Sequence, residues 1–303
     1  MNLPTVKQLR YLVAVDETRH FGKAAELCYV TQSALSTGIK ELETLLGVQL
    51  IDRTNKQVTT TQLGKDVATQ ARLSLKDIES IVELAANESK PLCGPLRLGI
   101  IPTIAPFILP SILPQIQIQY PELQVYLKED ITDNLHAQLM DGELDLLLLA
   151  LPYDLPGVET NVLFKDRFRL AYSHGTKLID PEKFSLNKLN RESLMLLEEG
   201  HCLRSHALQG CKLKRRDNIS RFSASSLFTL LQMVDSDLGI TLIPEMAKDS
   251  AQLKCSRVQT KPLADSYFRE IGLVWRRGSS RVSDYTALGE LITDVSGAQG
   301  APE

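Results

Sequence analysis

The N-terminal part of the chain has apolar residues at the spacing of α-helices. In residues 32–46 these positions are Leu35, Ile39, Leu42 and Leu46, separated by four, three and four residues. This spacing predicts a helix with one buried side. Thr31 is a suitable N-cap, and Gly47 ends the helix. Shorter patterns of the same kind predict helices at 6–15 and 22–27, so residues 5–61 are predicted to form a compact helical unit.

The opposite side of the 32–46 helix carries short polar side chains. They are Gln32, Ser33, Ser36, Thr37 and Lys40. An α-helix that enters the major groove of double-stranded DNA needs groups of this kind to contact base edges. The polar stretch 52–61 ends in β-branched residues and predicts a wing, from which Arg53 and Lys56 reach phosphates. Since any small helical domain has a polar face, the pattern alone leaves a role without DNA open.

One apolar stripe continues through residues 63–90. Its members are Leu63, Val67, Ala71, Leu75, Ile78, Val82 and Ala85. A long helix with a single stripe usually pairs with another helix. The alternative is that it packs on its own domain. The sequence Pro-Leu-Cys-Gly-Pro at 91–95 ends this helix and indicates a domain boundary.

From residue 96 onward, strand-like and helical patterns alternate. We expect strands at 96–101, 123–127, 144–149, 168–173, 194–197, 240–243 and 270–275, and helices at 108–120, 134–140, 225–235 and 283–295. Alternation predicts a parallel sheet covered by helices on both faces. Two such α/β lobes enclosing a cleft fit this order, with ligands beyond the carboxyl ends of strands.

Bulk composition narrows the class of protein. The chain has 303 residues, 43% of them apolar and 23% charged, as in soluble globular proteins. Residues 1–62 hold seven Lys and Arg against six Asp and Glu, so DNA binding would depend on geometry and a dimer rather than on a broad basic field. We find no signal-peptide pattern and no apolar run long enough to span a bilayer, and therefore expect a cytoplasmic protein. In that reducing compartment a disulfide is expected to be transient.

Two of the five cysteines form the main candidate for chemistry. Cys202 follows His201, precedes Arg204 by two positions, and lies nine residues before Cys211. The thiolate is the reactive form of cysteine, and nearby positive charge lowers the thiol pKa. If residues 202–211 were helical, the two thiols would lie on opposite faces, roughly 13 Å apart along the axis. A disulfide needs Cα atoms within about 7 Å, so joining them requires local refolding. The alternative is that Cys202 is buried and inert.

The N-terminal motifs resemble the winged helix-turn-helix of LysR-type transcriptional regulators. The matching runs are FGKAAEL at 21–27, VTQSALS at 30–36, and shorter ones at 39–43, 46–47, 53–54 and 61–64. The wing departs from the usual arginine-rich triplet, because it has Asn-Lys-Gln at 55–57. Lysine keeps a phosphate contact but loses the forked geometry of arginine.

The C-terminal motifs resemble the hydrogen-peroxide sensors of the same family. They are found at 99–103, 108–110, 198–204 (Glu-Glu-Gly-His-Cys-Leu-Arg), 211, 222, 239–244 and 271–274. Ser205 is a departure, because these sensors often have aspartate there. The resemblance implies an α+β multi-domain fold with a winged helix-turn-helix, a long linker helix and a two-lobed α/β effector domain like the periplasmic binding proteins.

We therefore expect three regions along the chain. Residues 1–62 are the DNA-binding domain, 63–92 the dimerisation helix and hinge, and 93–303 the redox-sensing effector domain. Within the last region, lobe I comprises approximately residues 95–166 and 269–295, and lobe II approximately residues 167–268.

The resemblance also implies roles for the site residues. Cys202 would be the peroxidatic thiolate, oxidised by hydrogen peroxide to a sulfenic acid, and Cys211 would resolve it as a disulfide. Thr103 and Thr132, each between a strand and a helix, would hold the peroxide, although N-capping is the alternative for both. His201 would orient the peroxide and supply a proton to the leaving oxygen, and Arg204 would stabilise the thiolate. Cys28 and Cys255 are interpreted as structural, and Cys93, at the hinge, has no assigned role.

The expected function is a peroxide-responsive activator of antioxidant genes, not an enzyme. Its expected partners are double-stranded promoter DNA, further copies of the chain in a dimer and tetramer, RNA polymerase, hydrogen peroxide and a reductant of the glutaredoxin or thioredoxin type, with no membrane. No cofactor or metal is expected. The switch segment would be 202–216, which ends in a basic patch. The alternatives are a LysR-type regulator that binds a small organic effector in the cleft, and a thiol peroxidase.

Overall fold

A computed structural model describes most of the chain. The described residues are 3–52, 58–86, 92–185, 189, 192–210, 219–263 and 267–298. They divide into two compact units, residues 1–89 with 141–143 and residues 90–140 with 144–303, and each is described by itself. The linker helix, predicted as a separate region, is thus grouped with the N-terminal domain. No helix in the described ranges is long and apolar enough to cross a membrane.

The first unit is a helical domain with a short two-stranded wing. Its elements are α1 (Val6–Thr18), α2 (Phe21–Leu27), α3 (Gln32–Leu46), β1 (Ile51–Asp52), β2 (Thr59–Thr60) and α4 (Gln62–Ala86). Helix α3 has the predicted bounds. The Thr31 hydroxyl accepts a hydrogen bond from the Ala34 N–H, and Gly47 ends the helix with a φ of 68°. Three of the four predicted apolar positions are buried, and Leu46 is 38% exposed. Strands β1 and β2 pair antiparallel, while Arg53 and Lys56 lie outside the described residues.

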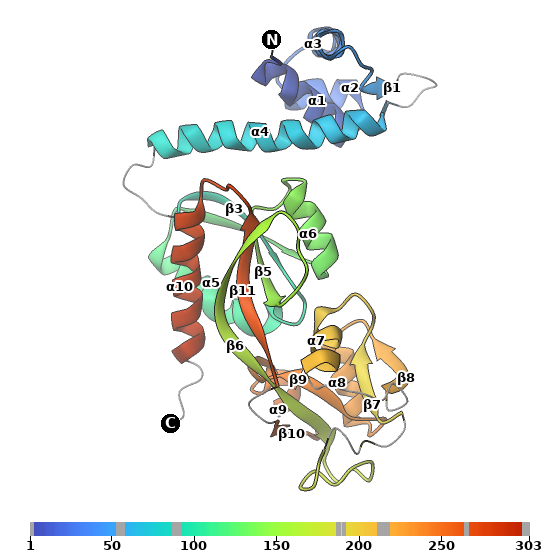
Figure 1. The fold of residues 1–303 in the computed structure, drawn as a ribbon. Coiled ribbons are helices and arrows are strands. Elements are labelled where there is room, and N and C mark those ends of the chain that lie inside the picture. The colour runs from blue at the N-terminus through green and yellow to red at the C-terminus, as the bar shows by residue number, and fades with distance from the viewer. Residues whose placement is uncertain are drawn as a thin grey trace. The chain divides into compact units, whose positions relative to one another are not determined.

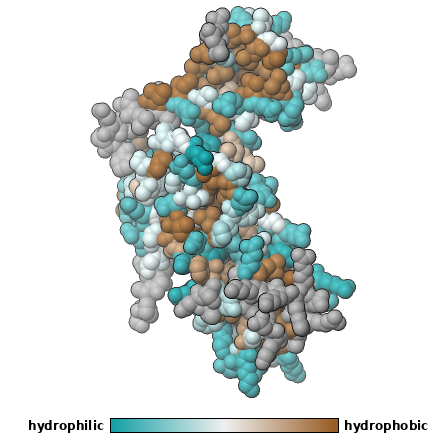
Figure 2. Space-filling view, viewed as in Figure 1, coloured by the Kyte–Doolittle hydropathy of each residue, from teal (hydrophilic) through white to brown (hydrophobic). Residues whose placement is uncertain are grey.

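The apolar stripe of α4 is only partly buried within the first unit. Ala71 and Leu75 are buried and α4 packs against α1, as the alternative interpretation expected. Leu63, Ile78 and Ile81 remain exposed within this unit. Apolar residues are visible on the surface of the first unit over α4 and the helices beside it (Figure 2). Pairing of these residues with a second helix remains a prediction.

The second unit contains two lobes joined by two strands. Its elements are β3 (Gly94–Ile100), α5 (Ala105–Gln119), β4 (Leu123–Glu129), α6 (Thr132–Met140), β5 (Leu146–Leu151), β6 (Val158–Ser173), β7 (Leu194–Leu197), α7 (Cys202–Gly210), β8 (Ile219–Ala224), α8 (Leu227–Asp235), β9 (Thr241–Pro244), the 3-10 turn η3 (Glu245–Ala247), α9 (Ala251–Lys254), β10 (Val258–Pro262), β11 (Phe268–Arg276) and α10 (Val282–Ala298). Strand β6 runs from one lobe into the other, with β11 alongside its first part (Figure 1).

The main sheet is mixed, so the expectation of a parallel sheet is only partly right. Strand β3 pairs parallel with β4 and β5, whereas β11, β9 and β10 pair antiparallel with their neighbours. The predicted strand 168–173 is the last part of β6, which begins ten residues earlier at Val158. The first part was missed because residues 158–167 are largely polar and only partly buried, so they lack a strong hydrophobic pattern.

Each lobe has its own apolar core. The core of lobe I is built from residues between 92 and 151 and between 271 and 292. The core of lobe II uses residues between 168 and 258. Cys202 is an exception in sequence position, because it belongs to the core of lobe I.

Candidate thiol site at the junction of the lobes

Cys202 is the first residue of α7 and its side chain leaves its own lobe. The side chain is 3% exposed and packs in the core of lobe I, while the next residue, Leu203, packs in the core of lobe II. The chain enters α7 after Gly200, whose φ of 96° is a conformation that favours glycine. Helix α7 covers residues 202–210, and Cys211 lies outside the described residues. The thiol therefore lies where the two lobes meet.

A buried ion pair faces this thiol. Arg269 on β11 is 1% exposed, and its Nε lies 2.9 Å from Oδ2 of Asp166 on β6. The two residues are register partners in the antiparallel pairing of these strands, so their side chains lie on the same face. The charge of Arg269 acts on Cys202 and favours its thiolate form. Sequence reasoning missed both residues.

The two predicted threonines are both brought to this site. Thr103 follows β3, and its hydroxyl and carbonyl oxygens each accept a hydrogen bond of 2.9 Å from the Arg269 guanidinium. Thr132 begins α6. Its hydroxyl is buried and has no hydrogen-bond partner of standard geometry among the described residues, but its interaction with Cys202 lowers the pKa of that thiol. Neither hydroxyl caps a helix, since α5 has no side-chain cap and the Thr132 oxygen is unpartnered. The capping alternative therefore does not hold.

Burial dominates the ionisation of Cys202. It raises the pKa of the thiol, and the charge of Arg269, the Thr132 hydroxyl and the backbone N–H groups at the start of α7 offset it only in part. The thiol is therefore mainly protonated in this state. The positive charge that acts on Cys202 is that of Arg269 and not of a sequence neighbour, and the net pKa of the thiol is raised rather than lowered, because a buried thiolate loses its hydration.

A second histidine, His206, lies inside the site. It is one helical turn after Cys202, so both side chains lie on the same side of α7. His206 is 5% exposed, and its Nε2 lies 2.9 Å from the Pro152 carbonyl oxygen, while its Nδ1 has no hydrogen-bond partner among the described residues. Burial lowers the pKa of His206, and the charge of Arg269 lowers it further. The ring is therefore neutral with the proton on Nε2, which leaves Nδ1 as a free acceptor.

The two predicted basic neighbours of Cys202 are placed differently. Arg204 donates a hydrogen bond from Nη1 to the Leu197 carbonyl oxygen at 3.0 Å and thereby holds the end of β7. The charge that acts on the thiol comes from Arg269, and a role of Arg204 toward the thiolate remains a prediction. His201 is half-buried in the loop before α7. Its role in proton supply also remains a prediction.

The remaining described cysteines are spread over both units. Cys28 ends α2 and is half-buried, with its Sγ 4.0 Å from the Arg10 carbonyl oxygen, and burial raises its pKa. Cys93 is half-buried at the start of the second unit, where Arg281 donates to its carbonyl oxygen. Cys255 is exposed after α9, so the interpretation of Cys255 as structural has no support from burial.

The predicted DNA-contacting residues share one face of α3. Gln32, Ser33, Thr37 and Lys40 are exposed and Ser36 is half-buried. This face lies opposite the buried side of the helix, and Gly38 on the buried side approaches the Tyr11 ring of α1. The structure thus presents the five polar residues together on a helix anchored to its domain.

Sequence signals for the missed residues differ in strength. The spacing of four between Cys202 and His206 places both on one helix face and was available from the sequence. Asp166 and Arg269 are 103 positions apart, and each is a single charge in a strand. No local pattern connects them, so only the pairing of β6 with β11 could have found them.

Comparison with known proteins gives matches over nearly the whole chain. A family model described as "Bacterial regulatory helix-turn-helix protein, lysR family" matches residues 6–65, and one described as "LysR substrate binding domain" matches residues 89–296. The HTH-type transcriptional regulator EstR of Acinetobacter baylyi is 40% identical, covering 97% of this chain and 98% of the relative. The DNA-binding transcriptional dual regulator OxyR of Escherichia coli is 38% identical, covering 95% and 94%. Among solved structures, a full-length OxyR variant from Pseudomonas aeruginosa aligns with a TM-score of 0.80 at 33% identity, covering 96% and 98%.

Proposed function

We propose that this chain, which belongs to the LysR family of DNA-binding transcriptional regulators, senses hydrogen peroxide through Cys202 and activates antioxidant genes. Members of this family are regulators, not enzymes, and they bind DNA and oligomerise. The similarity to OxyR proteins supports the proposal over almost the full chain. The similarity to EstR means that membership of the family does not itself select the signal.

The observation that carries the proposal is the polar lining of a buried thiol. Cys202 is enclosed with the Arg269 guanidinium and the Thr132 hydroxyl, and within the described part of the chain neither Thr132 Oγ1 nor the nearby His206 Nδ1 has a hydrogen-bond partner that meets standard geometry. An inert core cysteine needs none of these groups, and unpartnered buried polar atoms are costly. Hydrogen peroxide is small and both donates and accepts hydrogen bonds. It would satisfy the His206 nitrogen with one O–H and accept from the Thr132 hydroxyl.

The proposed chemistry is a two-electron oxidation of sulfur. The Cys202 thiol first loses its proton, and the thiolate attacks one peroxide oxygen. An S–O bond forms, the O–O bond breaks, and the departing hydroxide takes up a proton and leaves as water. We keep His201 as the candidate proton donor and assign Arg269 to stabilise the thiolate. One sulfenic acid and one water result from one thiol and one peroxide.

The second step would join Cys202 to Cys211. The Cys211 thiolate attacks the sulfenic sulfur, an S–S bond forms, and the S–O bond breaks to release hydroxide, which is protonated to water. A dithiol reductant of the glutaredoxin or thioredoxin type would reverse the reaction. Helix α7 places its last residue, Gly210, roughly 12 Å along the axis from Cys202, compared with the limit of about 7 Å between the Cα atoms of a disulfide, and Cys211 lies outside the described residues. Disulfide formation therefore requires Cys202 to leave the core of lobe I and α7 to unfold.

Refolding of α7 would change the packing between effector domains. We propose that the protein acts as a dimer through α4 and as a tetramer, so that altered packing respaces the α3 helices on promoter DNA and changes contact with RNA polymerase. The exposed apolar residues Leu63, Ile78 and Ile81 on α4 support the dimer. The polar face of α3 supports major-groove binding.

The decisive experiment is a peroxide titration of the reduced full-length protein, followed by mass mapping of disulfides and DNA footprinting. We expect a linkage between residues 202 and 211 at about one peroxide per chain, together with a shifted footprint. Cys202→Ser should abolish both responses. Cys255→Ser removes an exposed thiol and is the matched control, which should respond like the native protein. A shifted footprint without the linkage would exclude the proposal.

A regulator that binds a small organic effector between the lobes is the second candidate. Its support is the 40% identity to EstR and the raised pKa of Cys202, which an inert cysteine would also have. In that case Cys202→Ser would leave the footprint and its response to the inducing conditions unchanged. A thiol peroxidase would instead consume many equivalents of peroxide in the presence of a reductant.

A further inference from the structure

A pocket lies on the face of β6 opposite to Cys202. Side chains alternate along a strand, so Asp166 points to the buried side while Lys165 and Arg167 point to the other. The register with β11 extends this separation: Arg269 pairs with Asp166 on the thiol side, and Phe268 pairs with Arg167 on the other. The two faces of the same strands thus carry two separate groups of charged residues.

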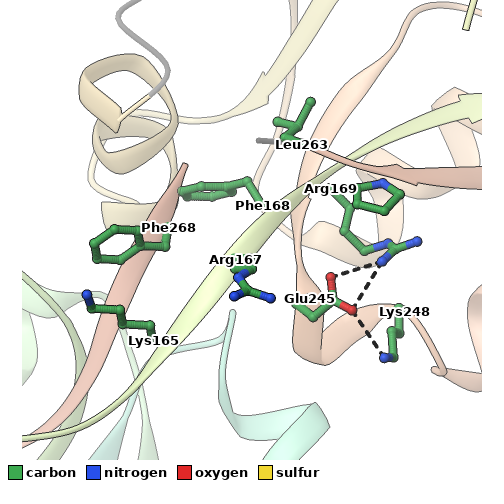
Figure 3. A pocket seen from close by; sticks show the side chains of 9 residues that line it. Lys165, Arg167, Phe168, Arg169, Glu245, Lys248, Leu263 and Phe268 are labelled. Carbon is green, nitrogen blue, oxygen red and sulfur yellow. Dashed lines mark hydrogen bonds and ion pairs between the residues drawn. The ribbon is translucent and has the colours of Figure 1, made fainter. Parts of the chain in front are cut away.

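Basic side chains dominate the lining of this pocket. It has a volume of about 510 Å³ and is lined by Lys165, Arg167, Phe168, Arg169, Glu245, Lys248, Pro262, Leu263 and Phe268 (Figure 3). Four of these side chains are cationic and one is a carboxylate. Glu270, the register partner of Lys165, adds a second carboxylate beside the pocket. The cations outnumber the carboxylates, so the pocket attracts anions.

Glu245 occupies the basic end of the pocket. Its carboxylate oxygens lie 3.0 and 3.1 Å from Arg169 Nη1, and Lys248 Nζ is 3.1 Å from Oε1. Burial raises the pKa of Glu245, but the hydrogen bonds from Arg169 and Lys248 outweigh it and hold the pKa below its usual value. A carboxylate of this chain therefore already shows how the two cations bind an anion.

The other end of the pocket is apolar. Phe168 and Phe268 lie near each other at that end, and Lys165 Nζ is 4.4 Å from the centre of the Phe268 ring (Figure 3); Leu263 also lines the pocket. The volume is that of a small-molecule site, and four apolar lining residues beside five charged ones suit a ligand with an apolar body and a charged group. We propose that it binds a small organic carboxylate with an apolar body, the carboxylate between Arg169 and Lys248 and the body against Phe268.

The pocket is connected to the thiol site through η3. Glu245 faces the pocket, whereas the next residue, Met246, contacts the thiol side. The Met246 backbone N–H donates to Asp166 Oδ1 at 3.2 Å, and its Sδ lies 3.8 Å from Arg269 Nη2. A bound anion competes with Glu245 for its cations and repels its carboxylate. Displacement of η3 would then loosen the Asp166–Arg269 pair that encloses Cys202.

The binding test uses calorimetry on the reduced full-length protein with three probes: phenylacetate, its neutral analogue phenylacetamide, and inorganic phosphate. We expect phenylacetate to bind at least about tenfold more tightly than phenylacetamide, because charged hydrogen bonds contribute about 1.5–3 kcal/mol. Lys248→Gln should weaken phenylacetate binding by about tenfold. Glu245→Gln should strengthen it, because the competing carboxylate is gone. Lys254→Gln, an exposed lysine on α9, is the matched control and should bind like the native protein.

Three results would overturn the assignment. Equal binding of phenylacetate and phenylacetamide would exclude an anion site, and phosphate binding without phenylacetate binding would exclude the organic ligand class. Phenylacetate binding that Lys248→Gln and Glu245→Gln leave unchanged would place the ligand elsewhere. Both substitutions are at partly exposed positions, and thermal melting of each variant checks that it is folded.

The connection to the thiol site has its own measurement. Phenylacetate should speed the alkylation of Cys202 by iodoacetamide by about fivefold, the lower end of usual coupling between sites, and Lys248→Gln should remove this effect. An unchanged rate with bound phenylacetate would refute the connection. Neither readout uses peroxide, so failure here and failure of peroxide sensing are separate results.

Discussion

Helices α3 and α7 carry the two candidate functions, and they are built in different ways. Helix α3 has 15 residues, a side-chain N-cap and a glycine C-cap, and its polar face points to solvent. Helix α7 has nine residues, and its first side chain is buried in the core of the other lobe. The partners of Cys202 come from β11 and α6, far away in sequence.

The difference reflects what each helix has to do. A surface that contacts DNA needs a rigid helix with exposed polar groups, which one segment can supply. A sensing thiol needs shielding and charged partners, which several segments must supply together. A helix as short as α7 has little stability on its own and depends on tertiary contacts. If the proposed oxidation of Cys202 removed those contacts, α7 would be free to refold.

The largest expected effect tests the dependence of the α7 site on tertiary partners. Arg269→Met leaves Asp166 buried without its cation, and we expect unfolding free energy to fall by about 3–5 kcal/mol. Urea unfolding followed by fluorescence of Trp275, the single tryptophan, reports on this unit. Arg97→Met, at an exposed position, should change stability by less than about 0.5 kcal/mol. Adding Asp166→Asn to Arg269→Met should restore part of the lost stability. If Arg269→Met were as stable as the control Arg97→Met, the buried ion pair would not contribute to stability.

The next effect tests how α3 is anchored. A Cβ at Gly38 would lie 2.7 Å from Cδ2 of the Tyr11 ring, so Gly38→Ala forces α3 away from α1. We expect a loss of about 1–3 kcal/mol. Thermal melting by circular dichroism measures it, with Thr37→Ala as the control at an exposed neighbouring position. A Gly38→Ala variant that melts like the native protein would contradict this close approach.

A smaller effect tests the solvent-facing side of α3. Thr37→Val should weaken binding to the footprinted promoter fragment by about 1 kcal/mol, roughly fivefold. Lys40→Ala should weaken it and reduce the slope of log affinity against log salt by about one. Fluorescence anisotropy at several salt concentrations measures both. Thr44→Ala lies outside the predicted contact set and is the control. An equal loss of affinity in this variant would show that Thr37 and Lys40 are not specific DNA contacts.

The smallest effect is a pH dependence of stability that arises inside the α7 site. The pKa of His206 is lowered in the folded state, so below about pH 6.5 the unfolded chain takes up a proton that the folded chain does not, and stability falls as pH falls. The pKa of Cys202 is raised, so above about pH 8.5 the unfolded chain loses a proton first and stability falls as pH rises. Each slope is at most about 1.4 kcal/mol per pH unit.

Two variants separate these slopes. His206→Gln should flatten the acid side and Cys202→Ser the alkaline side, as measured by Trp275 unfolding across the pH range. If His206→Gln retained the full acid slope, His206 would not be the buried neutral group described above.

Prediction from sequence succeeded where the information is local. The bounds of α3 followed from the spacing of Leu35, Ile39 and Leu42 and from its two caps. Thr103 and Thr132 were predicted as site residues because each lies between a strand and a helix, and Thr103 also lies in a family motif. The first half of β6 was missed because its polar residues give no strand pattern. The mixed sheet was missed because strand direction depends on pairing between distant segments.

The sequence by itself predicted the helices of the DNA-binding unit, most strands and helices of the second unit, and the thiol on which the proposed function depends, but not β8, β10 or α9. Only the tertiary structure decided that Cys202 leaves its lobe, that the charge of Arg269 acts on it, and that burial raises the pKa of its thiol. The physical reason is that periodicity and capping act between residues a few positions apart. Desolvation and buried charge depend on which distant segments meet, here β6, β11 and α6 around the start of α7.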